Sequence, residues 1–400
     1  MPDKPDGLVV WGGGSPATAR ERQREGAVVV CWPGAPRSSL EREGVPCRAV
    51  EEILGQEGLA AADNAGRTWA RVWGRVPLLD GKGFRELVEW RGTSLLWSAE
   101  AFLRDETAGP RCARAAEIAL RLLEATTPSE VDAPGLVPKD ALLLARACTV
   151  RGVLFHGPAP GQGRPLAVDR PSPRGGLGRV IADALAPAQP PSLHTLPGLE
   201  TASGGPLVAL VAGEGERLAL ATVLETASAD LGRGAAVVTL AELQRWETRR
   251  ARRSASDAEG QLREQGRRLR GTPGLAESYS HRGVAFADLA SGDLEALLAG
   301  HLPAVVRRIE AARELVVSSR APAVLLAMPG RDERRSLLHA CSSAGVATVV
   351  VRLGAPGAGD ADRTDAGPRP VATLDWATGD DPRPVVARLR EAARGRVEAG

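Results

Sequence analysis

Small residues directly after a short apolar run near the N-terminus form the first pattern that could do chemistry. The run is Leu8–Trp11, and the residues that follow it are Gly12, Gly13, Gly14 and Ser15. Glycines between a strand and a helix let backbone amides approach a phosphate at the helix N-terminus. With Ala17 the segment fits the pattern G-x-G-x-x-A, so it indicates either a phosphate-binding turn or only a tight strand-to-helix turn.

A second turn of the same kind follows the apolar run 207–212, and its residues are Gly213, Glu214 and Gly215. It lacks the third small residue, and Glu214 puts a carboxylate where a phosphate would lie. We interpret it as a plain turn or as a place for a catalytic carboxylate. Both glycine segments are kept as candidate ligand-binding segments.

A dinucleotide site would need an acidic residue after the second strand, where it holds a ribose hydroxyl. The second apolar run ends in Cys31-Trp32-Pro33, with no carboxylate beside it, although Arg37 could meet a 2′-phosphate. An NADP-linked oxidoreductase is therefore the weaker alternative.

His156 is the candidate catalytic residue. It ends the apolar run Val153–Phe155 and is followed by Gly157 and a Gly/Pro-rich segment. A histidine at the carboxyl end of a buried strand can act as a base or donate to a phosphate, and the glycine after it lets a ligand come close. The alternative is a solvated histidine at a strand terminus.

Arginines crowd a predicted helix over 241–270. The first cluster includes Arg249, Arg250, Arg252 and Arg253. Such a helix can rest on an anionic membrane surface or bind a polyanion, or it can simply present a solvated face. Few aromatic residues are interleaved with the arginines, which argues against single-stranded nucleic acid.

Composition limits the function classes. The chain has 400 residues, 43% of them hydrophobic, and its net charge is only +2, so no nucleic-acid partner is expected. The five cysteines form no C-x-x-C pair and are expected to be buried, reduced thiols, with no metal site and no cofactor. The N-terminal segment does not resemble a signal peptide and no apolar run is long enough to span a bilayer, which favours a cytoplasmic protein, peripheral to the inner membrane if the arginines bind lipid.

The elements that must position these residues alternate between apolar runs and helical stretches, which predicts an α/β fold with parallel sheets. We expect two tandem Rossmann-like domains in a GT-B-like arrangement. The predicted divisions are an N-terminal domain with a helical insert (1–157), a Gly/Pro-rich linker (158–204), a C-terminal domain (205–355), and a loop with a terminal strand and helix (356–400).

The two halves also align with each other at a spacing of 193 residues. Glu117 meets Glu310, Cys148 meets Cys341 and Gly152 meets Gly345 without a gap, and a spacing of 191 pairs Arg91-Gly92 with Arg282-Gly283. An internal duplication is the preferred interpretation, and shared α/β patterning is the alternative. Ligands of such sheets bind at the carboxyl ends of the strands, so we expect a site in the cleft between two lobes.

The segment Glu89–Trp97, which contains Gly92, Ser94, Leu95, Leu96 and Trp97, resembles a G-x-S-L-W segment. That segment occurs in bacterial surface-carbohydrate biosynthesis proteins whose architecture is similar to GT-B glycosyltransferases. His156-Gly157 fits the place where the N-terminal lobe of those proteins has His-Gly. The second half departs from the family pattern, because Arg352-Leu353-Gly354 stands where His-Gly is expected.

The resemblance implies a glycosyltransferase-like protein of surface-polysaccharide biosynthesis that binds a nucleotide-activated sugar. His156 would then act as base or phosphate donor. The missing second His-Gly leaves open a degenerate homologue that serves as a non-catalytic scaffold.

Overall fold

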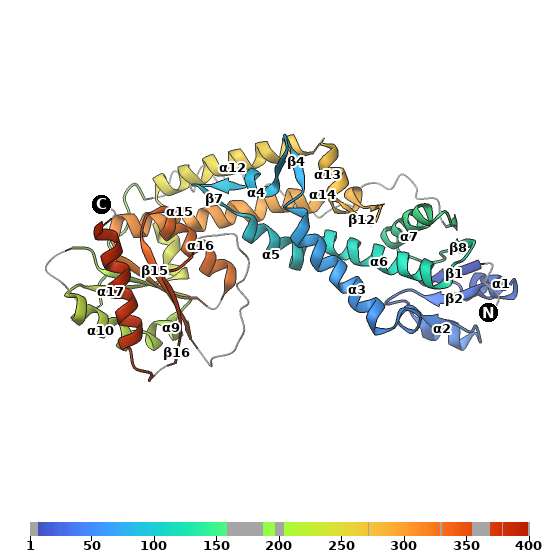
Figure 1. Ribbon diagram of the computed structural model, residues 1–400, viewed down its shortest axis with the longest axis horizontal. Helices are drawn as coiled ribbons and strands as arrows, with labels where there is room; N and C mark the ends of the chain where they lie inside the picture. Colours follow the sequence, from blue (N-terminus) through green and yellow to red (C-terminus); the bar gives the residue numbers. More distant parts are fainter. Residues whose placement is uncertain are drawn as a thin grey trace. The chain divides into compact units, whose positions relative to one another are not determined.

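The computed structural model describes residues 7–157, 187–196, 204–270, 272–328, 330–353, 369–377 and 379–398. It is an α/β structure with two five-stranded parallel sheets, each flanked by helices, which is compatible with the predicted Rossmann-like domains (Figure 1). Within the described ranges, none of the helices has both the length and the apolar character needed to span a bilayer.

The two compact units are discontinuous in sequence. Unit 1 comprises Met1–Phe84, Phe102–Arg170 and Gly266–Leu297, and unit 2 comprises Arg85–Ala101, Pro171–Gln265 and Leu298–Gly400. Each half of the sequence thus contributes a hairpin segment to the unit built mainly by the other half. The continuous ranges 1–157 and 205–355 expected from sequence do not include this exchange, and the linker 158–204 lies largely outside the described residues.

The sheet of unit 1 has the order β3-β2-β1-β8-β9. Its strands are β1 (Gly7–Trp11), β2 (Val28–Cys31), β3 (Arg48–Ala49), β8 (Glu130–Asp132) and β9 (Leu154–His156). Val9 and Trp11 pack with Ala19 of α1 (Pro16–Arg24) and Leu40 of α2 (Arg37–Arg42). Because side chains alternate along a strand, Leu8 and Val10 point to the opposite face, where they are also fully buried.

Unit 1 continues into a helical part around α3 (Val50–Trp73) and α6 (Ala108–Thr126), with α7 (Pro138–Arg151) beside β9. Trp69 and Trp73 on α3 are buried, and they contact Tyr279. The segment that carries Tyr279 consists of α13 (Pro273–Ser278), β12 (Ser280–His281), β13 (Val284–Ala285) and α14 (Ala287–Ala296). The hairpin β4 (Pro77–Leu79) and β5 (Lys82–Gly83) completes this part.

The sheet of unit 2 has the order β11-β10-β14-β15-β16. Its strands are β10 (Leu207–Val211), β11 (Ala235–Thr239), β14 (Ala323–Ala327), β15 (Ala347–Leu353) and β16 (Ala372–Trp376). Helices α10 (Ala221–Leu231) and α17 (Arg383–Glu398) pack into one apolar core with it, while α16 (Arg331–Ser343) packs against β14, β15 and α15 (Leu302–Ser319). The short α9 (Glu214–Ala219) follows β10.

The helical part of unit 2 contains α12 (Arg249–Leu269), α15 and the hairpin β6 (Glu89–Trp90) and β7 (Thr93–Ser94). The hairpin lies between α4 (Phe84–Leu87) and α5 (Leu96–Glu106). The single helix expected over 241–270 is broken into α11 (Leu240–Leu243), a 3₁₀ turn (Gln244–Trp246) and α12. The break has a local cause, because the Thr248 hydroxyl caps the new helix by accepting a hydrogen bond from Ala251 N at 3.2 Å.

The two sheets share the strand orders β2-β1-β8-β9 and β11-β10-β14-β15, and the spacing of 193 residues brings β8 onto β14 and β9 onto β15. The two hairpins also turn alike. Arg91 and Gly92 have φ of 49° and 73°, and Arg282 and Gly283 have φ of 49° and 87°. Two consecutive positive φ values match the right-handed twist of a tight two-residue hairpin, and glycine is the residue that tolerates them best.

Candidate functional site

The glycine segment after β1 packs against the loop after β8. Gly12 N donates a hydrogen bond to Pro134 O at 3.0 Å, and a Cβ on Gly12 would lie 2.6 Å from Leu136 Cα. A Cβ on Gly135 would overlap the carbonyl oxygen of Gly13. Ser15 caps α1 by accepting from Ala17 N at 3.4 Å. Close approach of two loops accounts for small residues at Gly12 and Gly135, and phosphate binding by Gly12–Ser15 stays a prediction.

The turn after β10 also has an internal partner. Gly213 N donates to Glu216 Oε2 at 3.0 Å, and Glu214 pairs with Arg217 at 3.5 Å. The carboxylate of Glu216 therefore takes the place at the Gly213 amide that a phosphate would need. The six residues of α9 also give only a small helix dipole.

His156 ends β9 with its side chain 41% exposed, and its Nε2 lies 3.0 Å from Glu130 Oε2. Arg22 joins this surface cluster, donating to Asp132 at 2.9 Å. β8 separates β9 from β1, so the histidine and Gly12–Ser15 share one edge of the sheet without being neighbours. Asp132 also lies opposite His156 in the register of β8 and β9, but its carboxylate is held by Arg22, so Glu130 is the carboxylate that contacts the imidazole.

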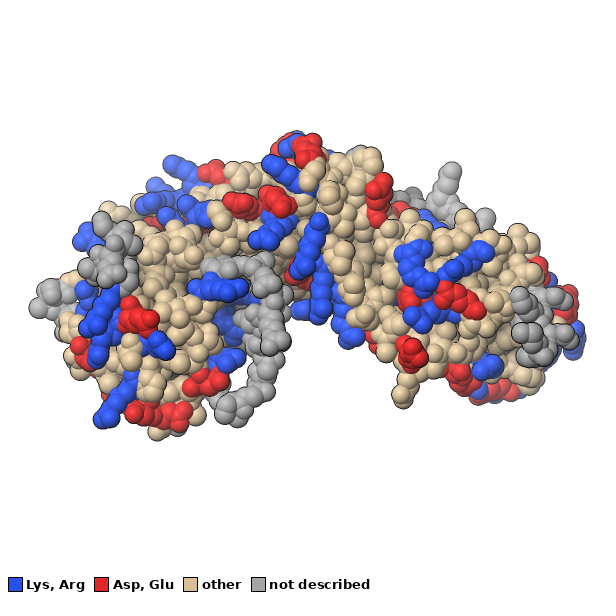
Figure 2. All heavy atoms as spheres, in the orientation of Figure 1, with Lys and Arg blue, Asp and Glu red and all other residues tan. Residues whose placement is uncertain are grey.

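A hollow of about 410 Å³ lies within unit 2, where the turn of β6 and β7 meets the first turns of α12 and the middle of α15. We call it the arginine hollow. Its charged lining consists of Arg91, Arg249, Arg250, Arg253 and Arg313, together with Asp257, Glu310 and Glu314. In the described part of the chain, five arginines of this lining face three carboxylates, which leaves two positive charges in excess. Figure 2 shows arginine side chains gathered over this end of α12.

The pattern of α12 explains why its arginines face outward. Ala251, Ala255, Ala258 and Leu262 recur at helical spacing and are all buried, so Arg249, Arg250 and Arg253 are left on the exposed side. No acidic residue lies in the first turn of this 21-residue helix. Cations at the positive end of a helix dipole are unfavourable by about 0.3–1 kcal/mol each. The arginines are thus placed against local preference, as at sites that bind anions.

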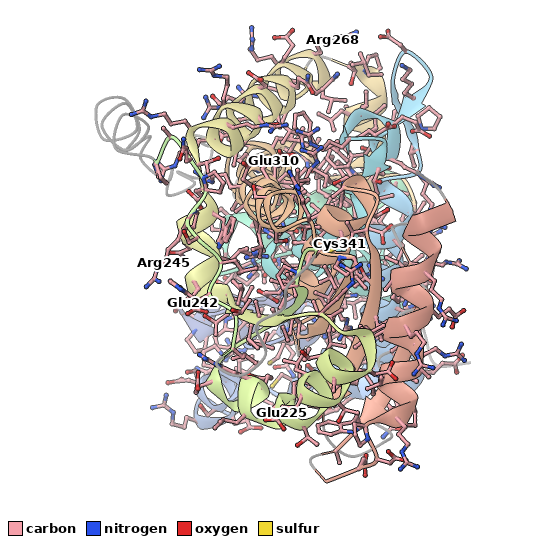
Figure 3. The ribbon with its side chains drawn as sticks, turned by 90° about the vertical axis from the view of Figure 1, so that its left-hand side faces the viewer. Glu225, Glu242, Arg245, Arg268, Glu310 and Cys341 are labelled. Atoms are coloured by element: carbon pink, nitrogen blue, oxygen red, sulfur yellow. The ribbon has the colours of Figure 1, made fainter. Side chains whose placement is uncertain are left out.

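Glu310 on α15 anchors the wall of the hollow (Figure 3). Its carboxylate accepts from Arg91 Nε at 2.6 Å, from Arg91 Nη2 at 3.0 Å and from Trp90 Nε1 at 2.8 Å. Arg91 Nη2 also donates to Ser254 Oγ at 2.8 Å. Burial would raise the pKa of Glu310, but the hydrogen bonds from Arg91 and Trp90 outweigh it and hold the pKa below its ordinary value. The pair fixes the β6–β7 turn against α12 and α15.

Arg313 lacks such a partner. Its side chain is half-buried, and its Nε is buried without a hydrogen bond. Among the residues that the structure describes, Arg250, Arg253 and Arg313 form no ion pair within 4.0 Å of a carboxylate. Burial lowers the pKa of Arg313, and the nearby charge of Arg91 lowers it further. A bound anion would supply the missing counter-charge and hydrogen-bond acceptor.

Sequence reasoning found part of this site. It singled out Arg249, Arg250 and Arg253, whereas Arg252 pairs with Glu247 at 3.5 Å and does not line the hollow. The Arg91-Gly92 pair stood out through the internal alignment and as part of the segment Glu89–Trp97, and Glu310 through the alignment alone. The sequence around Arg313 did not mark it as a candidate. Arg313 is recognisable as a charged residue on a packed face of α15 only once the helices that pack against α15 are known.

Comparison of the chain with known sequence families, with curated proteins and with solved structures finds no match.

Proposed function

We propose that the chain is a glycosyltransferase-like protein that binds a nucleotide-activated sugar, and that the arginine hollow of unit 2 receives the diphosphate. The observation that carries the proposal is a hollow of about 410 Å³ that contains three arginines without a carboxylate partner in the described chain. This volume lies within the range of about 300–1,000 Å³ that is usual for small-molecule sites.

Arginine suits this ligand because its planar guanidinium offers paired N–H donors to phosphate oxygens. Arg250, Arg253 and Arg313 would bind the oxygens, while Arg91 is held by Glu310 and adds positive potential. If glycosyl transfer occurs, the same charges stabilise the diphosphate as it leaves with extra negative charge. Asp257 and Glu314 also line the hollow and are the carboxylates available to accept a proton there.

Isothermal titration of the full chain with inorganic pyrophosphate, UDP-glucose, GDP-mannose and NADP tests the proposal. The test variant is R250A/R253A, and the control is R263A/R267A, which removes two positive charges from the same helix outside the hollow. Loss of two charge-assisted contacts of about 1.5–3 kcal/mol each should weaken binding at least tenfold in the test variant alone. Equal weakening in both variants would show that only overall charge matters.

Two further assays separate the alternatives. Binding of a sugar nucleotide without release of its sugar to water or an acceptor would favour the degenerate scaffold. Binding to vesicles of anionic lipid, but to none of the soluble ligands, would instead favour a membrane surface as the partner of Arg249, Arg250, Arg252 and Arg253. We further propose that the two units arose by duplication, supported by the shared strand order.

A further inference from the structure

A second, smaller pocket of about 170 Å³ lies in unit 2, further along α12 from the arginine hollow. We call it the acceptor pocket, after the hydrogen-bond acceptors in its lining and not after an acceptor substrate. Its polar lining consists of Glu86, Glu89, Trp90, Gln261 and Gln265, and Leu95, Ala258 and Leu262 form part of its apolar wall. Its volume is less than half that of the arginine hollow, which suits a single ring better than a whole nucleotide.

The chemistry of the acceptor pocket is opposite to that of the hollow. Among the residues that the structure describes, neither an arginine nor a lysine lines it. Glu86 and Glu89 contribute carboxylate oxygens, which are hydrogen-bond acceptors. Gln265 Oε1 is a buried acceptor that receives no hydrogen bond from the described residues. The pocket therefore repels phosphate and favours an uncharged group rich in donors.

The two sites are continuous along the helices. Asp257 lines the hollow and Gln261, one turn later on α12, lines the acceptor pocket; Glu310 and Val306 are related in the same way on α15. Trp90 and Arg91 are adjacent in the hairpin, and both hold Glu310. From Arg253 to Gln261 the helix rises by about 12 Å, a length suited to a diphosphate and one attached ring.

Resting on the proposed function, we infer that the acceptor pocket binds the sugar ring of the ligand whose diphosphate lies in the arginine hollow. Sugar hydroxyls donate to Glu86, Glu89 and Gln265, and the apolar face of the ring lies against Trp90. A uracil base fits this lining less well, because its two carbonyl oxygens would face carboxylates. The ligand thus lies along α12, with its phosphates toward the helix N-terminus.

Titration of the full chain with inorganic pyrophosphate, UDP and UDP-glucose tests this placement. The variants are E89Q and Q265L, and the control is E225Q, an exposed carboxylate on α10 of the same unit (Figure 3). We expect UDP-glucose to bind about tenfold more weakly to each pocket variant, while pyrophosphate and UDP stay within about twofold of their wild-type affinity. The melting temperature of each variant checks that it is folded.

Other outcomes overturn the inference in distinguishable ways. If wild-type protein binds UDP-glucose no more tightly than UDP, or if E89Q and Q265L weaken UDP as much as UDP-glucose, the sugar does not occupy the pocket and the proposed function stands. If pyrophosphate, UDP and UDP-glucose all fail to bind wild-type protein, the proposed function fails and the inference fails with it.

Discussion

Glu117 and Glu310 hold the same place in their respective units, each as a buried carboxylate bound by the arginine of a hairpin turn. Glu117 accepts from Arg282 at 3.1 Å, as Glu310 does from Arg91. The surrounding arginines do not share this correspondence. Under the 193-residue register, Arg249, Arg250, Arg253 and Arg313 align with Gln56, Glu57, Ala60 and Leu120. The carboxylate–arginine pair is therefore a feature of both units, whereas the arginines that line the hollow occur in unit 2 alone among the described residues.

Replacement of either carboxylate by glutamine keeps the size of the side chain and should destabilise the protein. In E310Q the amide can still accept from Trp90, but Arg91 loses its counter-charge. We expect the free energy of unfolding to fall by about 1–3 kcal/mol, less than for a fully buried pair because Arg91 is partly exposed. E117Q should behave alike, since Glu117 also binds His281 and Arg121. Urea unfolding measures both, and a fall below about 0.5 kcal/mol, the size of an ordinary surface substitution, would contradict a structural role.

The effect of E310Q should depend on pH. The folded-state pKa of Glu310 is held below its ordinary value, so its contribution to stability is present above the unfolded pKa of about 4.3. It is lost as the pH falls through the lower, folded pKa. The gap in stability between wild type and E310Q should therefore be largest near about pH 6–7 and shrink below about pH 4. A gap that stays constant down to about pH 3.5 would show that the charge of Glu310 is not involved.

The sequence predicted the sheets better than the helical parts. Apolar runs such as Leu8–Trp11 and Leu207–Val211 are buried on both faces of a parallel sheet, so they are recognisable from composition alone. The exchange of the hairpins at Arg91 and Arg282 between units was not predictable, because local periodicity does not reveal which long helix a hairpin packs against. The arginine hollow depends on that exchange, so the sequence predicted the arginines of α12 but not the residues that meet them in the hollow.

Gly135 should tolerate no side chain. It has φ of +68°, and a Cβ there would overlap the Gly13 carbonyl. Overpacking costs about 1–3 kcal/mol, and the left-handed backbone about 1–2 kcal/mol more for alanine. Gly14 is the matched control, since its φ is +85° but no atom lies within 4 Å of the position that an added methyl group would take. G135A should lower the melting temperature well below that of G14A, and equal losses would show that strain alone matters.

Thiol reactivity should single out one cysteine. Cys31, Cys112, Cys148 and Cys341 are buried, and Cys47 is partly exposed. Burial raises the pKa of Cys148 and of Cys341 to about 12, which keeps both as unreactive thiols at neutral pH. One equivalent of a thiol reagent should react quickly with the native protein, and C47S should abolish that phase. Fast labelling of Cys148 or Cys341 would contradict their placement in the two cores.

Arg313 should lower the stability of the ligand-free protein. Burial and the charge of Arg91 both oppose its ionisation, and it has no carboxylate partner in the described chain. The register gives leucine at the equivalent position, Leu120, which is fully buried on α6. R313L should therefore raise the stability of the free protein, by about 0.5–2 kcal/mol if it follows other substitutions that relieve a local conflict.

R313L should weaken the binding of pyrophosphate, although it stabilises the free protein. Pyrophosphate at saturation stabilises a protein by mass action, so it should raise the melting temperature of wild type and do so much less for R313L. Salt provides a second contrast, because ions screen the repulsion between Arg313 and its arginine neighbours and should stabilise wild type more than R313L. R313K keeps the charge but not the planar donors, and should recover the salt effect without full recovery of pyrophosphate binding. If R313L is less stable than wild type and still binds pyrophosphate fully, Arg313 is a structural residue. The carboxylates that line the hollow then balance its positive charge without a bound anion.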